Sequence, residues 1–65
     1  MRYEIRCEGG MNGHMPIHTV DERDVWDLLR YIDIFYGRIQ YLTIGSPSEG
    51  VATVNGKPVH FMVVL

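Results

Sequence analysis

The sequence predicts a two-layer α+β sandwich, in which one helix packs on a four-stranded, mainly antiparallel sheet in the order β-α-β-β-β. Three patterns predict this fold. Residues 2–8 alternate between polar and apolar side chains, residues 20–36 carry an apolar stripe at helical spacing, and two strand-like runs flank Asn55-Gly56. With 65 residues the chain has room for one domain, which we place at 1–65.

The first strand is expected at residues 2–8, because its side chains alternate strictly between two faces. Tyr3, Ile5 and Cys7 point to one face, and charged side chains point to the other. A loop is expected at residues 9–18, where three glycines, an Asn-Gly pair and a proline disfavour regular structure.

The helix is expected at residues 20–36. Thr19 and Glu22 stand at the spacing of a capping box, in which each side chain bonds a backbone amide of the first turn. The apolar stripe consists of Val25, Leu28, Leu29, Ile32 and Tyr36. Gly37 follows and is suited to end the helix in a left-handed conformation.

The remaining strands are expected at 38–45, 51–54 and 59–65, with a turn at 45–50 between the first two. Asn55-Gly56 predicts a tight hairpin between the last two strands. Pro58 has no amide proton to donate and is therefore expected at the start of its strand. The pattern leaves open which of these strands lies beside the first one.

Two of these segments, 39–44 and 59–65, are apolar on both faces. One helix covers only one face of a sheet, so the second face needs another cover. Either Met11, Met15 and Ile17 of the glycine-rich segment fold over it, or it meets a partner or another copy of the chain.

Composition excludes several classes of function. A single cysteine forms no internal disulfide, and no apolar run of about 18 residues is present to span a membrane. Six basic against eight acidic residues give a net charge of −2, which argues against direct binding of nucleic acid. We therefore expect a protein that binds neither membrane nor nucleic acid directly.

The sequence offers little support for two kinds of chemical site, a zinc site and a catalytic nucleophile. A zinc site would use Cys7, His14, His18 and His60, but the paired ligand spacing of structural zinc sites is absent, and Cys7 falls on the apolar face of its strand. A nucleophile would be Cys7, Ser46 or Ser48, but no motif supplies its base and orienting group. The expectation is a protein that is not an enzyme, with no catalytic residue, metal or cofactor.

The strongest functional feature is the acid concentrated along the expected helix. Residues 20–36 contain five acidic and two basic residues, a net charge of −3, whereas the rest of the chain sums to +1. Large side chains beside carboxylates are typical of a recognition surface. The predicted partner-binding residues are Asp21, Glu22, Asp24, Trp26, Asp27, Tyr31 and Asp33, and the predicted partner is a protein with a basic nucleic-acid-binding surface.

A second interpretation of these residues is structural. Asp27 stands at helical spacing from Arg23 and from Arg30, as in a solvated face stabilised by ion pairs. Trp26 is equally compatible with a side chain lying over the edge of the sheet. Ile34 also projects away from the apolar stripe, which favours the recognition surface.

In its size, its acidic helix and its lack of catalytic motifs, the chain resembles small phage-encoded inhibitors of the anti-CRISPR class. The resemblance implies a cytoplasmic binder that blocks the nucleic-acid channel of its target. The chain is also similar in these respects to bacterial toxin-immunity proteins, and a homodimeric assembly protein is a further alternative.

Overall fold

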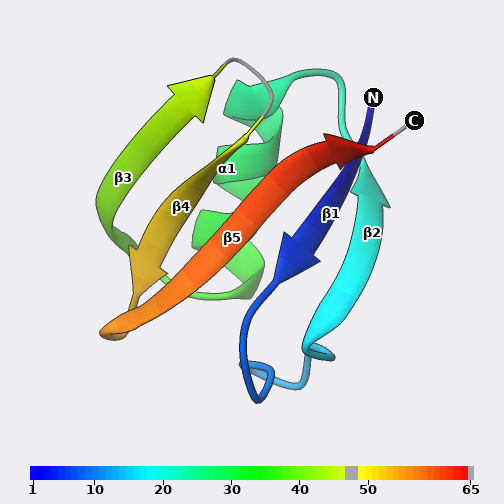
Figure 1. Cartoon of the computed structure of the whole chain (residues 1–65). Helices are drawn as coiled ribbons and strands as arrows, with labels where there is room; N and C mark the ends of the chain where they lie inside the picture. The colour runs from blue at the N-terminus through cyan, green and yellow to red at the C-terminus, as the bar shows by residue number, and fades with distance from the viewer. Residues whose placement is uncertain (47–48, 65) are drawn as a thin grey trace.

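One helix packs against one face of a five-stranded antiparallel sheet in the computed structural model of the protein (Figure 1). The elements are β1 (Arg2–Arg6), β2 (Ile17–Asp21), α1 (Val25–Phe35), β3 (Ile39–Ser46), β4 (Glu49–Val54) and β5 (Lys57–Val64). The structure describes residues 1–46 and 49–64. Pro47 and Ser48, in the expected turn at 45–50, and Leu65, in the expected last strand, lie outside the described residues.

The α+β class is confirmed, but the expected four strands and the order β-α-β-β-β are wrong. The additional strand is β2, which lies where the sequence predicts a loop and the start of the helix. It pairs antiparallel with β1, so that Ile5 lies opposite His18 and Tyr3 lies opposite Val20. The glycine-rich segment before it is the connection of a hairpin.

The strand order in the sheet is β2-β1-β5-β4-β3. The first strand therefore lies between its own hairpin partner and the last strand, with Ile5 opposite Phe61. β4 and β5 form the hairpin predicted at Asn55-Gly56, whose φ angles of 52° and 76° are those a two-residue turn requires. Pro58 lies at the second position of β5.

The helix begins five residues later than predicted. Asp24, and not Thr19, caps it: the Asp24 carboxylate accepts a hydrogen bond from the Asp27 amide at 3.0 Å. The expected capping box is wrong, because Thr19 belongs to β2 and Glu22 follows that strand. At the other end the Gly37 amide donates to the Ile32 carbonyl at 3.1 Å, and Gly37 has a φ of 143°, as the predicted stop requires.

The core lies between α1 and the strands β1, β5 and β4. The predicted stripe supplies its helical half, since Leu28, Leu29, Ile32 and Tyr36 are buried. The strands contribute Tyr3, Ile5, Ala52, Val54, Val59 and Phe61, and Cys7 is buried beside them. No helix among the described residues is long and apolar enough to cross a bilayer.

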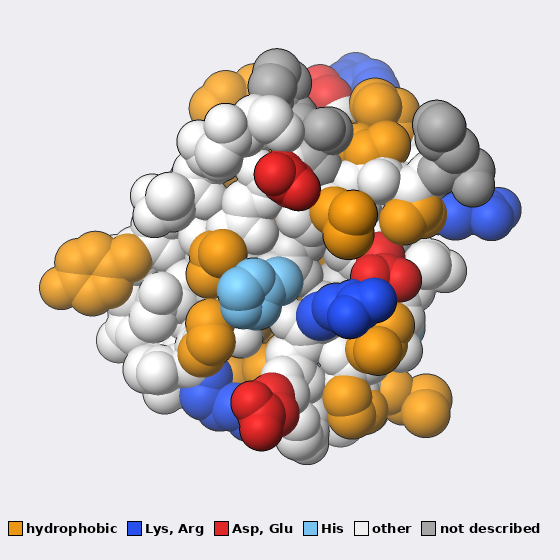
Figure 2. All heavy atoms as spheres, viewed as in Figure 1, with side chains coloured by type: hydrophobic (Ala, Val, Ile, Leu, Met, Phe, Trp, Pro, Cys, Tyr) orange, Lys and Arg blue, Asp and Glu red, His pale blue; other side chains and the backbone are white. Residues whose placement is uncertain are grey.

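The opposite face of the sheet, here called the open face, is not covered by the glycine-rich segment. Met11 packs against the core, Met15 is 70% exposed, and Ile17 is an exposed residue of β2. The expectation that these three side chains fold over the second face is therefore wrong. Within residues 1–46 and 49–64 no segment lies over this face (Figure 2).

The cap at Asp24 gives a direct test of where the helix begins. Asp24→Ala removes the acceptor for the Asp27 amide and should lower the free energy of unfolding by about 1 kcal/mol. Thr19→Ala is the matched variant at the cap that the sequence suggests, and it should cost only a few tenths of a kcal/mol, because Thr19 is an exposed strand residue. Urea denaturation measures both. The opposite ranking would contradict the observed helix start.

Candidate protein-binding surface

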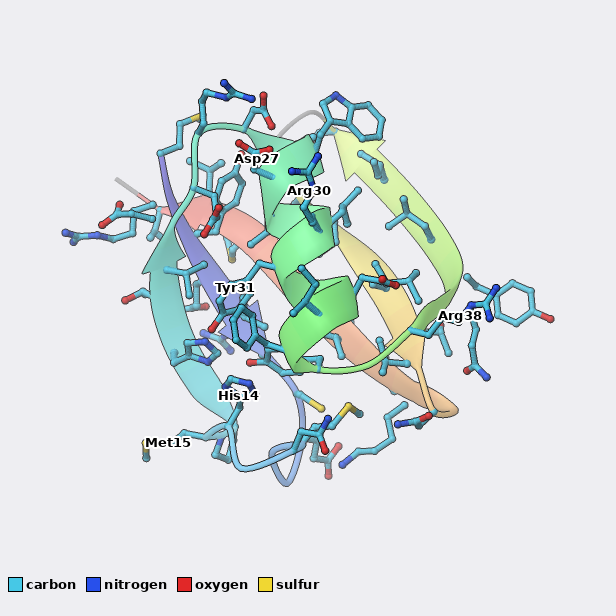
Figure 3. All side chains as sticks on the ribbon, turned by 180° about the vertical axis from the view of Figure 1, so that it is seen from behind. His14, Met15, Asp27, Arg30, Tyr31 and Arg38 are labelled. Carbon is cyan, nitrogen blue, oxygen red and sulfur yellow. The ribbon has the colours of Figure 1, made fainter. Side chains whose placement is uncertain are left out.

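The outer side of α1 forms a shallow hollow of about 460 Å³. It is lined by Glu22, Arg23, Asp27, Arg30, Tyr31, Ile34 and Phe35. Trp26 lies one helical turn before Arg30 on the same side of the helix. We call these eight residues the helix surface. Figure 3 shows Asp27, Arg30 and Tyr31 projecting from this side of α1.

The helix surface combines exposed apolar side chains with paired charges. Trp26, Ile34 and Phe35 are 67%, 65% and 52% exposed. Arg23 lies 3.3 Å from the carboxylate of Asp27, an ion pair across one turn. The charge of Asp27 is therefore partly balanced within the chain, as the structural interpretation of the sequence expects.

The structure divides the predicted partner-binding residues into two groups. Glu22, Asp27 and Tyr31 line the hollow, and Trp26 lies one turn before Arg30, which also lines it. The other three do not join them: Asp21 is the exposed last residue of β2, Asp24 caps the helix, and the Asp33 carboxylate accepts a hydrogen bond from the Ile39 amide at 3.0 Å. Two of the predicted carboxylates thus have structural partners.

Sequence reasoning did not identify Phe35 as a candidate. Its ring lies 4.7 Å from that of Tyr31, one turn earlier, and extends the apolar part of the surface. The available signal was the four-residue spacing from Tyr31, which places both rings on one side of a helix.

An aromatic cluster lies where the β1–β2 hairpin meets the end of the helix. The His14 ring stacks on the Tyr36 ring at 4.4 Å and on the His18 ring at 5.3 Å. The Tyr36 hydroxyl is 2.9 Å from Nδ1 of His18, and the Tyr31 hydroxyl is 3.4 Å from Nε2 of the same ring. Asn12 completes the junction by donating to the Tyr36 carbonyl at 2.7 Å. Through His18, the β1–β2 hairpin therefore contacts Tyr31, which is a residue of the helix surface.

Burial sets the protonation of this cluster. It raises the pKa of Tyr36 to about 12, with smaller contributions from Tyr31 and Cys7. Burial also lowers the pKa of His18, and the nearby His14 lowers it further. The Tyr36 hydroxyl thus keeps its proton at neutral pH, and we infer that it donates this proton to Nδ1 of a neutral His18.

The residues weighed for zinc do not converge. Cys7 is buried, with Sγ 3.8 Å from the Gly10 carbonyl, and His60 lies in β5 opposite Arg6, on the open face. His14 and His18 instead engage the aromatic cluster. Among the residues that the structure describes, no three His, Cys, Asp or Glu side chains form a group that could hold a metal ion. Of the weighed nucleophiles, Ser48 lies outside the described residues, and Ser46 is the last residue of β3.

A second and broader hollow, of about 760 Å³, lies on the open face. Its lining includes Glu4, Arg6, Val51, His60 and Met62. Nε of Arg6 lies 2.6 Å from the Glu4 carboxylate, so these two charges balance each other. Figure 2 shows this face as a mixture of charged, histidine and apolar side chains. Within this lining Met62 is 41% exposed, which is less than Trp26, Ile34 and Phe35 on α1.

Comparison of the chain with protein-family models, with curated proteins and with solved structures finds no match. The anti-CRISPR resemblance therefore stays a prediction.

The lowered pKa of His18 predicts how stability depends on pH. At His18 the folded protein binds fewer protons than the unfolded chain, in which this side chain titrates near pH 6.5, so the contribution of His18 to the free energy of unfolding should fall as the pH drops below about 6.5. His18→Asn should flatten this dependence between about pH 7 and pH 5. His60→Asn, an exposed change on the open face, should leave it as in the wild type. Equal pH dependence in the wild type and His18→Asn, followed by urea denaturation, would refute the assignment.

Proposed function

We propose that the protein is a non-catalytic binding protein that docks its helix surface on a protein partner with a basic nucleic-acid-binding site. The observation that carries the proposal is the exposure of three large apolar side chains, Trp26, Ile34 and Phe35, on the part of α1 that the sheet does not cover. Such side chains are the usual centres of protein–protein interfaces, where Trp is among the most enriched residues.

The apolar side chains supply the energetic reason for docking. Burying one large apolar side chain contributes roughly 1.5–3 kcal/mol. Trp26 and Ile34 are about two-thirds exposed in the free chain, so most of that contribution is still available to a partner. A shallow hollow beside them, lined by Tyr31 and Phe35, suits an aliphatic or aromatic side chain from the partner.

The eight residues of the helix surface carry no net charge, so attraction of a basic partner depends on carboxylates that have no partner within the chain. Asp21 and Glu22 have no side-chain partner among the described residues. The other three carboxylates of this segment are engaged: Asp24 and Asp33 accept hydrogen bonds from backbone amides, and Asp27 pairs with Arg23. Glu22 belongs to the helix surface, and Asp21 precedes it in the chain. They would attract a basic surface over a distance of about 8–10 Å at physiological salt.

The specific form of the proposal is inhibition by occupancy. A basic surface that binds nucleic acid cannot bind this protein at the same place, so docking would exclude the nucleic acid. The net charge of −2 is small for imitation of a phosphate backbone. Steric exclusion anchored by Trp26, with charge contributing to the rate of association, fits the observed surface better than charge imitation alone.

The apolar anchor is tested by truncation. A photo-crosslinking residue at position 34 should capture the partner inside cells, and the affinity of the purified pair is then measured by titration calorimetry. Trp26→Ala should weaken binding by about thirtyfold, as is usual for a central interface residue. The matched control is Tyr41→Ala, which truncates an aromatic side chain that is 75% exposed on β3. Equal affinities of the two variants would contradict docking through the helix surface.

The charge and occupancy claims are tested by reversal and competition. Asp21→Lys together with Glu22→Lys should slow association, and the effect should shrink as salt is raised. These positions are preferable to Asp24, whose replacement would also remove the helix cap. Glu8→Lys, an exposed reversal in the hairpin connection, is the control. Nucleic acid should compete with the protein for the partner; simultaneous binding of both would exclude inhibition by occupancy.

A further inference from the structure

The strand β3 is an open edge of the sheet. It is eight residues long, it pairs only with β4 among the described strands, and the residues from Gln40 to Gly45 are exposed. Leu42 and Ile44 point to the helix side of the sheet, opposite Ala52 and Gly50, yet remain 41% and 38% exposed. Figure 1 shows β3 at the far side of the sheet from β2, beyond β4.

The hairpin between β4 and β5 determines which backbone groups of β4 face β3. In a two-residue hairpin the residues flanking the turn, here Val54 and Lys57, form a hydrogen-bonded pair. Hydrogen-bonded pairs alternate along an antiparallel ladder, so Ala52 also bonds to β5. Val51, next to it, therefore directs its amide and carbonyl toward β3.

The same alternation continues into β3. Thr43 is the partner of Val51 and uses its amide and carbonyl in that pair. The amides and carbonyls of its neighbours Leu42 and Ile44 then point away from the sheet. Such groups are a template on which another strand can pair.

Between its two register shifts, at Ile39/Tyr41 and at Ile44/Ser46, β3 has a regular stretch, Tyr41–Ile44, on which neither a charge nor a proline prevents such pairing. The segment Ile39–Ser46 contains no charged residue and no proline, and it is rich in β-branched and aromatic residues. The other edge, β2, has only five residues, follows Pro16 and ends at Asp21. Of the two edges, β3 is the one suited to pairing.

We propose that β3 pairs antiparallel with β3 of a second copy of the chain, with Thr43 opposite Thr43 across a two-fold axis. This register places Leu42 opposite Ile44 of the second copy, and Ile44 opposite its Leu42. Both are hydrogen-bonded pairs, so the outward amides and carbonyls of the two residues are all used. Each pair also joins two apolar side chains on the helix side of the sheet.

A second copy is the favoured occupant because the edge complements itself. With no charge between Ile39 and Ser46, two copies bring no like charges together. The two-fold arrangement is also closed: each copy uses its one long edge, and the short β2 edges end the resulting ten-stranded sheet. The inference is independent of the helix surface, which lies on α1.

Two charged variants test the register. Leu42→Lys and Ile44→Glu should each raise the dimer dissociation constant by roughly tenfold, because each places a charge opposite an apolar side chain in two symmetric pairs. An equimolar mixture of the two should recover a heterodimer, with the lysine opposite the glutamate and the remaining Ile44 opposite Leu42. Analytical ultracentrifugation measures the masses, and circular dichroism confirms that each variant is folded. A wild-type chain that stays monomeric up to millimolar concentration, or a mixture that stays monomeric, would overturn the proposal.

A cysteine at the two-fold axis supplies a second test. Directly opposed residues of a non-hydrogen-bonded pair lie about 4.5 Å apart at Cα, within the range of a disulfide. Thr43→Cys should therefore oxidise rapidly to a covalent dimer, and the native Cys7 is buried. Thr19→Cys, at an exposed position of the β2 edge, is the matched control. Equal rates of disulfide formation in the two variants would contradict a two-fold axis at Thr43. Equal rates are also the result expected if β3 pairs only with a strand of another protein.

Discussion

A helix is about 10 Å wide with its side chains, whereas five strands spaced about 4.8 Å apart extend across roughly 19 Å. This difference in width determines how the molecule is organised. α1 lies over the middle of the sheet, where its buried Leu28 and Ile32 meet the apolar residues of β1, β5 and β4. It leaves the residues of β3 from Gln40 to Gly45 exposed, so that Leu42 and Ile44 remain partly exposed although they face the helix layer. The two proposed interaction surfaces, the outer side of α1 and the edge of β3, are therefore both uncovered in the single chain.

On the side of α1 that meets the β1–β2 hairpin, the space beside the helix is filled by the aromatic cluster and not by a second helix. Tyr36 is fully buried, and the β1–β2 hairpin contacts it through His14, His18 and Asn12. These polar contacts satisfy the Tyr36 hydroxyl and carbonyl, which would otherwise be costly to bury. The hairpin thereby stabilises the end of α1 and supports Tyr31 at the margin of the helix surface.

The sequence was sufficient to predict the elements with strong local signals. The alternation around Tyr3 and Ile5, the helical stripe from Leu28 to Tyr36, and the Asn55-Gly56 turn each predict what the structure contains. β2 was not predicted because its side chains do not alternate between polar and apolar. Its inward residues are His18 and Val20, and its outward residues include Ile17.

The helix start was misplaced for a related reason. Thr19 and Glu22 have the spacing of a capping box, but Asp24 offers a competing cap, and pairing of β2 with β1 decides between them. The same shift removes Asp21 from the helix and gives Asp24 a structural role. Of the predicted acidic site, Glu22, Asp27 and Tyr31 line one hollow, whereas Asp24 and Asp33 have structural partners that the prediction did not anticipate. Both partners are close in the chain, three and six residues away, but which carboxylate caps the helix and which one meets β3 depends on where α1 begins and ends.

The central claim is that one helix leaves β3 as a bare edge whose backbone groups are available to a second copy. Amide hydrogen exchange followed by NMR at several protein concentrations tests it most directly. The Thr43 amide, paired with β4, should exchange slowly at every concentration, whereas those of Leu42 and Ile44 should exchange fast in dilute protein and slowly in concentrated protein. Equal, concentration-independent exchange at these three amides would contradict the account.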